Sequence, residues 1–311
     1  MRRAMVILII SGWSITVLPA QQGTYNFLLA DVSARAAALS GSFISMKDDP
    51  NGLFYNPASI GTLSTPKISA SYVNHLMDVN AGTLSFGQHL EGIGNIGAGV
   101  LYMNYGTFNR TDEFLNVLGT FGASDLALVA GIAAHYDDDI LVGINAKFIT
   151  SSIAEYSSTA LAVDIGFLYD IPSQNLSIGG SVMNIGKQLK TYAGLNELLP
   201  LDVKIGITKR PEHLPVFLNI DFHRLNANGD KFLDRFSNFT LGAEFLMSTS
   251  LRVRVGYNNK QRKELKTGTS AGMGGFSLGV GLVLNDYQID YAYNSYGDFG
   301  GIQRFSLGIN L

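Results

Sequence analysis

From residue 67 to the C-terminus, the chain repeats one pattern about fourteen times: roughly ten residues alternate apolar and polar, and a turn rich in Gly, Asn, Asp or Pro follows. One such stretch places Val253 and Val255 on one face and Arg252 and Arg254 on the other. Alternation of this kind predicts strands with one apolar and one polar side. Because a strand in lipid must pair along both edges, the repeat predicts an all-β fold, a closed 14-stranded antiparallel transmembrane β-barrel with polar groups inside.

The connections between the expected strands alternate in length. The strands are expected at residues 67–75, 81–90, 93–105, 124–136, 140–151, 157–169, 176–186, 201–208, 214–223, 238–246, 251–258, 272–283, 287–294 and 303–311. Every second connection is short, whereas 106–123, 187–200, 224–237 and 259–271 are long. Outer-membrane barrels have short periplasmic turns and longer external loops, so this asymmetry predicts periplasmic N- and C-termini. A soluble β-sandwich or propeller would also alternate, but the nearly uncharged outward face favours the membrane barrel.

Residues 1–20 have the layout of a secretory signal peptide. Arg2 and Arg3 precede an apolar stretch, and Leu18-Pro19-Ala20 forms the expected cleavage site. The chain has no cysteine, which excludes disulfides, thiol chemistry and a lipid-modified N-terminal cysteine. Its formal net charge of −3, without a concentrated basic face, argues against nucleic-acid binding.

Residues 21–66 lack the alternation. An Ala-rich run, 34–39, has apolar residues at helical spacing before Gly41. Two turn-like sites follow, at Asp48-Asp49 and at Asn56. The segment is too apolar to remain in water, so we expect residues 21–66 to form a hatch or plug and residues 67–311 to form the barrel.

Several ionisable residues face the barrel interior, the lumen, if the alternation is in phase. They carry both signs: Asp164, Asp202, Lys204, Asp221, Glu244, Arg252, Arg254, Asp290 and Arg304. An open channel can hydrate such groups one by one, whereas a plugged barrel must pair them. We therefore expect an ion-paired lumen network, with Arg35 bonded to a lumen carboxylate such as Asp164, Asp202 or Asp290.

Three motifs that imitate chemical sites have simpler structural explanations. The glycines at 92, 94 and 97 match GxGxxG, but they open a strand after a tight turn and not a helix. Ser277 sits in a Gly-x-Ser-x-Gly sequence in the middle of an expected strand, where a nucleophile elbow does not form. Residues 137–139, three aspartates, lack the spaced donors of a calcium loop. The sequence thus predicts no catalytic, cofactor or metal site, and no enzyme.

Part of the N-terminal segment resembles a family signature. It includes Asn26 to Leu29 and the hatch motif Ser33, Ala34, Arg35, Asp48, Asp49, Asn56 and Pro57. Similarity continues at Leu199 to Asp202, at Gly256-Tyr257-Asn258 with Arg262, and at residues 275–279. These residues resemble the PorV/PorQ family of outer-membrane barrels, which are related in fold to the fourteen-stranded FadL fatty-acid transporters. Ser40 before Gly41 and the C-terminal Leu311 depart from the pattern.

The resemblance implies a non-enzymatic component of the type IX secretion system, closest to PorQ. Such a protein would act in the outer membrane of a Gram-negative, Bacteroidetes-like cell as a scaffold for the surface attachment complex that handles secreted cargo. Its implied partners are outer-membrane lipid and a PorZ-like surface protein. The alternative is a FadL-like channel for hydrophobic small molecules, with an outer-membrane lipase as a more distant option. A continuous apolar pocket inside the barrel would favour the channel.

Overall fold

The structure, a computed structural model, describes residues 23–75, 79–192, 194, 196–227, 232–266 and 272–311. The expected signal peptide, residues 1–20, lies outside the described residues. Among the described residues, no helix has the length and hydropathy needed to cross a membrane.

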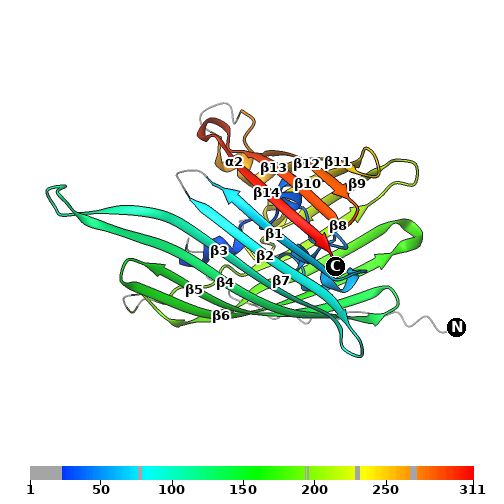
Figure 1. Ribbon diagram of the computed structural model, residues 1–311, viewed down its shortest axis with the longest axis horizontal. Helices are drawn as coiled ribbons and strands as arrows, with labels where there is room; N and C mark the ends of the chain where they lie inside the picture. The colour runs from blue at the N-terminus through cyan, green and yellow to red at the C-terminus, as the bar shows by residue number, and fades with distance from the viewer. Residues whose placement is uncertain (1–22, 76–78, 193, 195, 228–231, 267–271) are drawn as a thin grey trace.

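Fourteen antiparallel strands form one closed barrel, in which each strand pairs with its neighbours along the chain and β14 pairs with β1 (Figure 1). The strands are β1 Lys67–Asn74, β2 Asn80–Leu90, β3 Gly94–Thr111, β4 Val117–Asp137, β5 Ile140–Ile153, β6 Tyr156–Ile171, β7 Leu176–Lys190, β8 Asp202–Lys209, β9 Val216–Phe222, β10 Phe239–Leu246, β11 Leu251–Asn258, β12 Phe276–Leu284, β13 Tyr287–Ser295 and β14 Gly301–Asn310. The predicted fold class is therefore confirmed.

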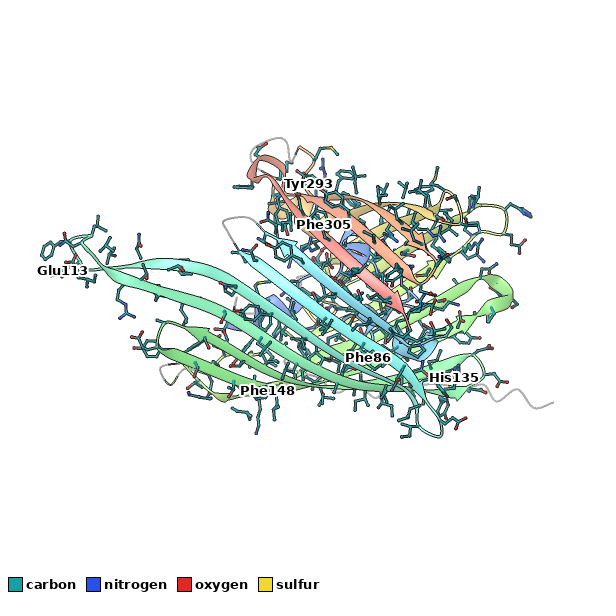
Figure 2. All side chains as sticks on the ribbon, in the orientation of Figure 1. Phe86, Glu113, His135, Phe148, Tyr293 and Phe305 are labelled. Atoms are coloured by element: carbon teal, nitrogen blue, oxygen red, sulfur yellow. The ribbon has the colours of Figure 1, made fainter. Side chains whose placement is uncertain are left out.

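The alternation of side chains explains why these strands close into a barrel. In β5, Val142 and Phe148 are more than 40% exposed, whereas Lys147 and Ile149, the two neighbours of Phe148 in the chain, are buried. Apolar side chains such as Phe148 and Phe305 project from the outer face (Figure 2). Each strand thus presents an apolar band outward and packs its other face into the lumen.

The two ends of the barrel differ in their connections. At one end, here the short-turn end, every connection is six residues or shorter, as between β12 and β13. At the other, the long-loop end, residues 191–201, 223–238 and 259–275 form long connections. Leu311 lies at the short-turn end, where its N–H donates to Pro66 O at 2.8 Å. Which end faces the periplasm stays a prediction.

One predicted loop is wrong. Most of residues 106–123 extend β3 and β4 into a two-stranded ribbon that projects beyond the rest of the barrel, with Glu113 at its tip (Figure 2). The phenyl rings of Phe108 and Phe121 pack across the ribbon with their centroids 5.5 Å apart. Its glycines and asparagines are typical of loops, but cross-strand pairing overrides that local preference.

The N-terminal segment lies inside the barrel (Figure 1, blue). Its elements are η1 Thr24–Leu29, α1 Ala34–Ala38, η2 Pro50–Phe54 and η3 Pro57–Thr62; the remaining helices are η5 Pro172–Gln174, η6 Phe232–Ser237, α2 Asn259–Glu264 and η7 Gly297–Phe299. The segment was expected at the short-turn mouth, but it extends from that mouth towards the long-loop end of the lumen. Whereas η3 packs against β4 and β5 at that mouth, Tyr25 in η1 bonds Ser158 near the long-loop end. Its action as a hatch stays a prediction.

Candidate functional site

Arg35 belongs to a buried cluster that joins the N-terminal segment to the barrel wall. Its guanidinium contacts Asp49 at 3.1 Å and Glu244 of β10 at 2.9 Å. Glu244 also accepts from Arg254 of β11 at 2.5 Å, and Arg254 contacts Asp290 of β13 at 2.5 Å. Burial opposes the charge of Arg35, but Glu244 and Asp49 together raise the pKa of Arg35 above its usual value. We call these five residues the charge cluster.

Arg35 therefore bonds a lumen carboxylate, but not one of the three named from the sequence. Asp164 instead pairs with Lys147, whose Nζ lies 2.9 Å from its carboxylate and 2.7 Å from Asn184 Oδ1. Lys147 was missed in the sequence analysis because the rest of its strand is largely apolar. Its position, in phase with the buried Asn145 and Ile149, was the available signal.

The expected lumen network is incomplete. Lys204 pairs with Asp202 at 3.4 Å, and Asp221 accepts from Ile44 N–H at 2.9 Å but has no ion pair among the described residues. Arg252 does not join, because its Nη1 donates to Ser248 O at 2.5 Å and to Leu251 O at 3.2 Å.

The remaining hatch-motif residues dock the N-terminal segment. Ser33 caps α1 by accepting from Ala36 N–H, and Ala34 N–H donates to Ser306 of β14 at 2.8 Å. Asn56 caps η3, which begins at Pro57, and donates to Ile44 O and Phe167 O at 2.9 Å each. Asp49 caps η2, and Asp48 pairs with Lys67 at 2.7 Å. These contacts hold backbone against the barrel and form no reactive arrangement.

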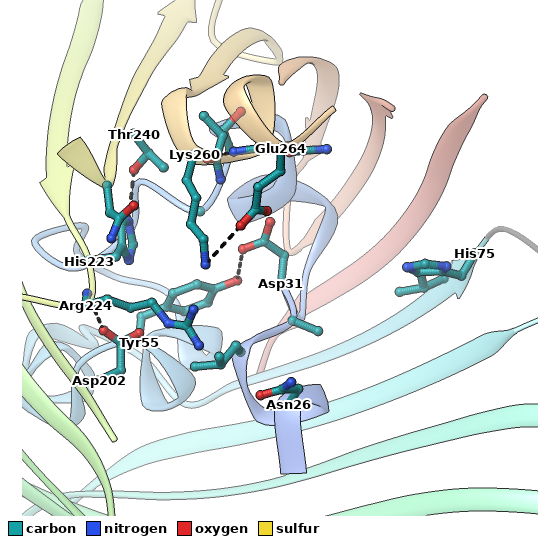
Figure 3. Close-up of a pocket in the computed structure, with 18 of the residues that line it drawn as sticks. Asn26, Asp31, Tyr55, His75, Asp202, His223, Arg224, Thr240, Lys260 and Glu264 are labelled. Carbon is teal, nitrogen blue, oxygen red and sulfur yellow. Dashed lines mark hydrogen bonds and ion pairs between the residues drawn. The ribbon is translucent and has the colours of Figure 1, made fainter. Parts of the chain in front are cut away.

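A cavity of about 580 Å³ lies in the lumen at the long-loop end (Figure 3). One side is apolar and comes mainly from β1 to β3 and from the N-terminal segment: Leu29, Ala30, Val73, Ala81, Leu101 and Met103. The other side is charged and comes from β8, β14, α2 and the loop after β9: Asp202, Lys204, Arg224, Lys260, Glu264 and Arg304. Asp202, Lys204 and Arg304 are predicted from the sequence to face the lumen, and only the structure brings them to one cavity.

Most charges in the cavity have partners. Lys260 lies 3.5 Å from Glu264, and the Tyr55 hydroxyl donates to Asp31 at 3.2 Å (Figure 3). His223 is close by, and burial together with the positive charge of Lys204 lowers the pKa of His223 to about 4. The imidazole is therefore neutral at physiological pH.

The motifs that imitate active sites contain no reactive arrangement. Ser277 is buried and bonds Ser40 Oγ at 2.8 Å and Asn294 Nδ2 at 2.6 Å. Its two partners are polar groups without a basic side chain, so they do not activate a nucleophile. Within the described residues, no group of three or more His, Cys, Asp or Glu side chains is arranged to hold a metal ion.

The fold resembles solved barrel structures over most of the chain. The Pseudomonas putida toluene transporter TodX matches with a TM-score of 0.59 and 11% identity, over 90% of this chain and 96% of TodX. The Ralstonia pickettii toluene transporter TbuX matches with a TM-score of 0.57 and 12% identity, over 89% of this chain and 96% of TbuX. A Pseudomonas aeruginosa FadL homologue matches with a TM-score of 0.51 and 11% identity, over 89% of this chain and 97% of the homologue.

Comparisons of sequence add no family. No protein-family model matches the chain, and no curated protein matches it. At about one identical residue in nine, the structural likeness shows a shared fold, that of FadL-type barrels. It gives no support to a PorV/PorQ membership or to a PorZ-like partner.

Proposed function

We propose that this protein is a non-enzymatic outer-membrane barrel that binds hydrophobic small molecules in its lumen and conducts them across the membrane. The observation that carries the proposal is the cavity of about 580 Å³, whose apolar side lies inside a closed barrel. Ligand pockets typically measure 300–1,000 Å³ and combine apolar walls with a few polar groups. Structures of the same fold are described as toluene transporters, which supports this reading over the secretion scaffold.

Binding of the apolar fluorophore 1-aminoanthracene to the purified protein in detergent tests the proposal. We expect saturable binding that excess toluene displaces. Ala81→Phe should abolish it, because Ala81 lines the cavity and is 5% exposed. Leu84→Phe is the matched control, because Leu84 lies on the same strand but is 45% exposed on the outer face. Equal binding by wild type and both variants would place the fluorophore in detergent or on the outer surface, and the proposal would fail.

The scaffold for a surface attachment complex stays a second candidate. One observation favours it: the N-terminal segment and the charge cluster fill the lumen near the short-turn end, as expected for a barrel that does not conduct. Purification from native envelopes, with and without the ribbon of residues 107–121, tests this role. A stoichiometric surface protein that is lost with the ribbon, together with no binding of 1-aminoanthracene, would favour the scaffold.

A further inference from the structure

Helix α2 stands at the long-loop rim of the barrel (Figure 1). Its inner face is turned to the lumen, where Lys260, Gln261 and Glu264, together with the following Leu265, line the cavity. Lys260 and Glu264 lie 3.5 Å apart there (Figure 3). The single carboxylate of α2 therefore lies on the lumen side and already contacts a cation.

The outer face of α2 carries positive charge alone. Helical spacing places Arg262 and Lys263 away from the lumen-facing positions, and neither lines the cavity. Lys266 follows two residues beyond the end of the helix and does not line the cavity either. Lys263 and Lys266 are exposed, Arg262 is half-buried, and none of the three pairs with a carboxylate among the described residues. We call these three residues the cationic face.

A row of aromatic side chains lies next to this face on the lipid-facing surface. Phe222, Phe239, Tyr257 and Phe276 occupy the long-loop ends of β9 to β12, each in phase with exposed apolar residues of its strand, such as Leu278 for Phe276. The ring centroid of Tyr257 lies 6.1 Å from that of Phe239 and 5.1 Å from that of Phe276. Aromatic belts on membrane barrels lie at the level of the lipid headgroups. The row therefore places the headgroup level beside α2.

Arg262 joins the cationic face to the aromatic row. Its guanidinium lies over the ring of Phe276, 5.5 Å from the centroid, and its Nη1 donates to Gly272 O at 3.1 Å and to Gly274 O at 3.2 Å. These contacts hold a cation at the headgroup level, next to the lipid-facing surface. Basic side chains at this level attract anionic lipid headgroups, and the guanidinium of arginine is well suited to bind phosphate.

We propose that the cationic face of α2 binds the phosphate groups of a phosphorylated lipid in the leaflet that surrounds the long-loop end. Tyr257 and Phe276 contact the part of the lipid next to its headgroup. The inference concerns the outer surface of the barrel, so it goes beyond the proposed function and does not depend on the ligand of the lumen. It gives the lipid partner expected from the sequence one defined place on the molecule.

Native mass spectrometry of the purified protein, titrated in detergent with lipid A, tests the inference. Lipid A is a glycolipid that carries phosphate groups. The variant with Arg262→Gln, Lys263→Gln and Lys266→Gln, here the α2 variant, should bind lipid A about tenfold more weakly than wild type, because it lacks the three cations at the membrane surface. Both proteins should bind phosphatidylcholine equally, because its headgroup has no net charge.

The matched control carries Arg110→Gln, Lys187→Gln and Lys190→Gln, which remove the same charge at the same end of the barrel, from β3 and β7. It should keep the wild-type affinity for lipid A. Equal affinity of wild type and the α2 variant, or an equal loss in the control, overturns the inference. Displacement of lipid A by inorganic phosphate, but not by sodium chloride of the same ionic strength, also overturns it, because the site would then hold free phosphate.

If the α2 variant does not fold, as judged by its heat-dependent mobility on a detergent gel, Lys263→Gln decides. The side chain of Lys263 is exposed, so its replacement leaves the packing of α2 intact. We expect its affinity for lipid A to fall about fivefold, and an unchanged affinity overturns the inference. Each of these results leaves the proposed function standing, because none of the substituted residues lines the cavity.

Discussion

Strands β3 to β7 are 14 to 21 residues long, whereas β8 to β13 are only 7 to 9 residues long. The first group, the tall wall, forms a continuous sheet whose pairing extends beyond the lumen. The second group, the low wall, falls short of the 9–11 residues of a typical membrane-spanning strand or barely reaches it. Long connections and α2 complete its rim and supply much of the charged side of the cavity.

Buried charge is also distributed unequally between the two walls. Among the described residues, the tall wall buries three charged side chains, Asp125, Lys147 and Asp164, whereas the low wall buries five, Asp202, Asp221, Glu244, Arg254 and Asp290. The low wall has fewer backbone pairs per strand, and the charge cluster joins three of its strands to the N-terminal segment. We expect the low wall to depend more strongly on that segment, because buried ion pairs join the two, whereas η3 packs against β4 to β6 of the tall wall without such pairs.

Removal of the N-terminal segment should have the largest effect. Deletion of residues 24–60 takes away the side chains that fill the lumen, so we expect the barrel to conduct ions in planar bilayers. The measurement is single-channel conductance of the purified variant beside wild type. An intact barrel that stays closed would show that other residues, such as the long connections of the low wall, block the lumen.

Glu244→Gln should destabilise the low wall most among single substitutions. It leaves the buried guanidiniums of Arg35 and Arg254 with too little negative charge, and we expect a loss of about 3–5 kcal/mol in the free energy of unfolding. Urea unfolding in detergent measures it. The double variant with Arg35→Gln should lose less than the sum of the single losses, because removing both partners avoids an unpaired charge. Additive losses would mean that the cluster does not act as a unit.

Lys147→Met tests the corresponding pair in the tall wall and should cost less. Asp164 keeps hydrogen bonds from Asn145 Nδ2 and Asn184 N–H, so we expect a loss of about 2–3 kcal/mol. Lys187→Met on the exposed side of β7 is the control, with little expected change. A loss equal to or above that of Glu244→Gln would remove the distinction between the two walls.

Shortening the ribbon should have the smallest effect. Residues 107–111 pair only with residues 117–122, and the other neighbouring strands of β3 and β4 end before this level. Replacement of residues 107–121 by Asn-Gly should leave the urea midpoint of the barrel unchanged. A lower midpoint would show that the ribbon stabilises the tall wall, for instance through Arg110 and Glu155, which lie 2.7 Å apart.

The sequence alone was sufficient to predict the fold. Alternation with a period of two and turn residues are local signals, so fourteen strands were predicted with most boundaries within three residues of those observed. The helix near Ala34 was predicted for the same reason, from spacing and a following glycine. The ribbon was missed because its glycines and asparagines are typical of loops, whereas cross-strand pairing, for example of Phe108 with Phe121, overrides that local preference.

The sequence also indicated which charges face inward, because a residue's side of the sheet follows from its position in the alternation. Only the tertiary structure decided which charges meet. Glu244 lies opposite Arg254 through strand register, and Arg35 reaches Glu244 only because the N-terminal segment folds into the lumen. Arg304 lies opposite Val73 because β14 pairs with β1 at the barrel closure, between strands more than two hundred residues apart. Which charged side chains form ion pairs depends on distances between residues that are far apart in the chain, and the apolar–polar alternation of the sequence does not contain those distances.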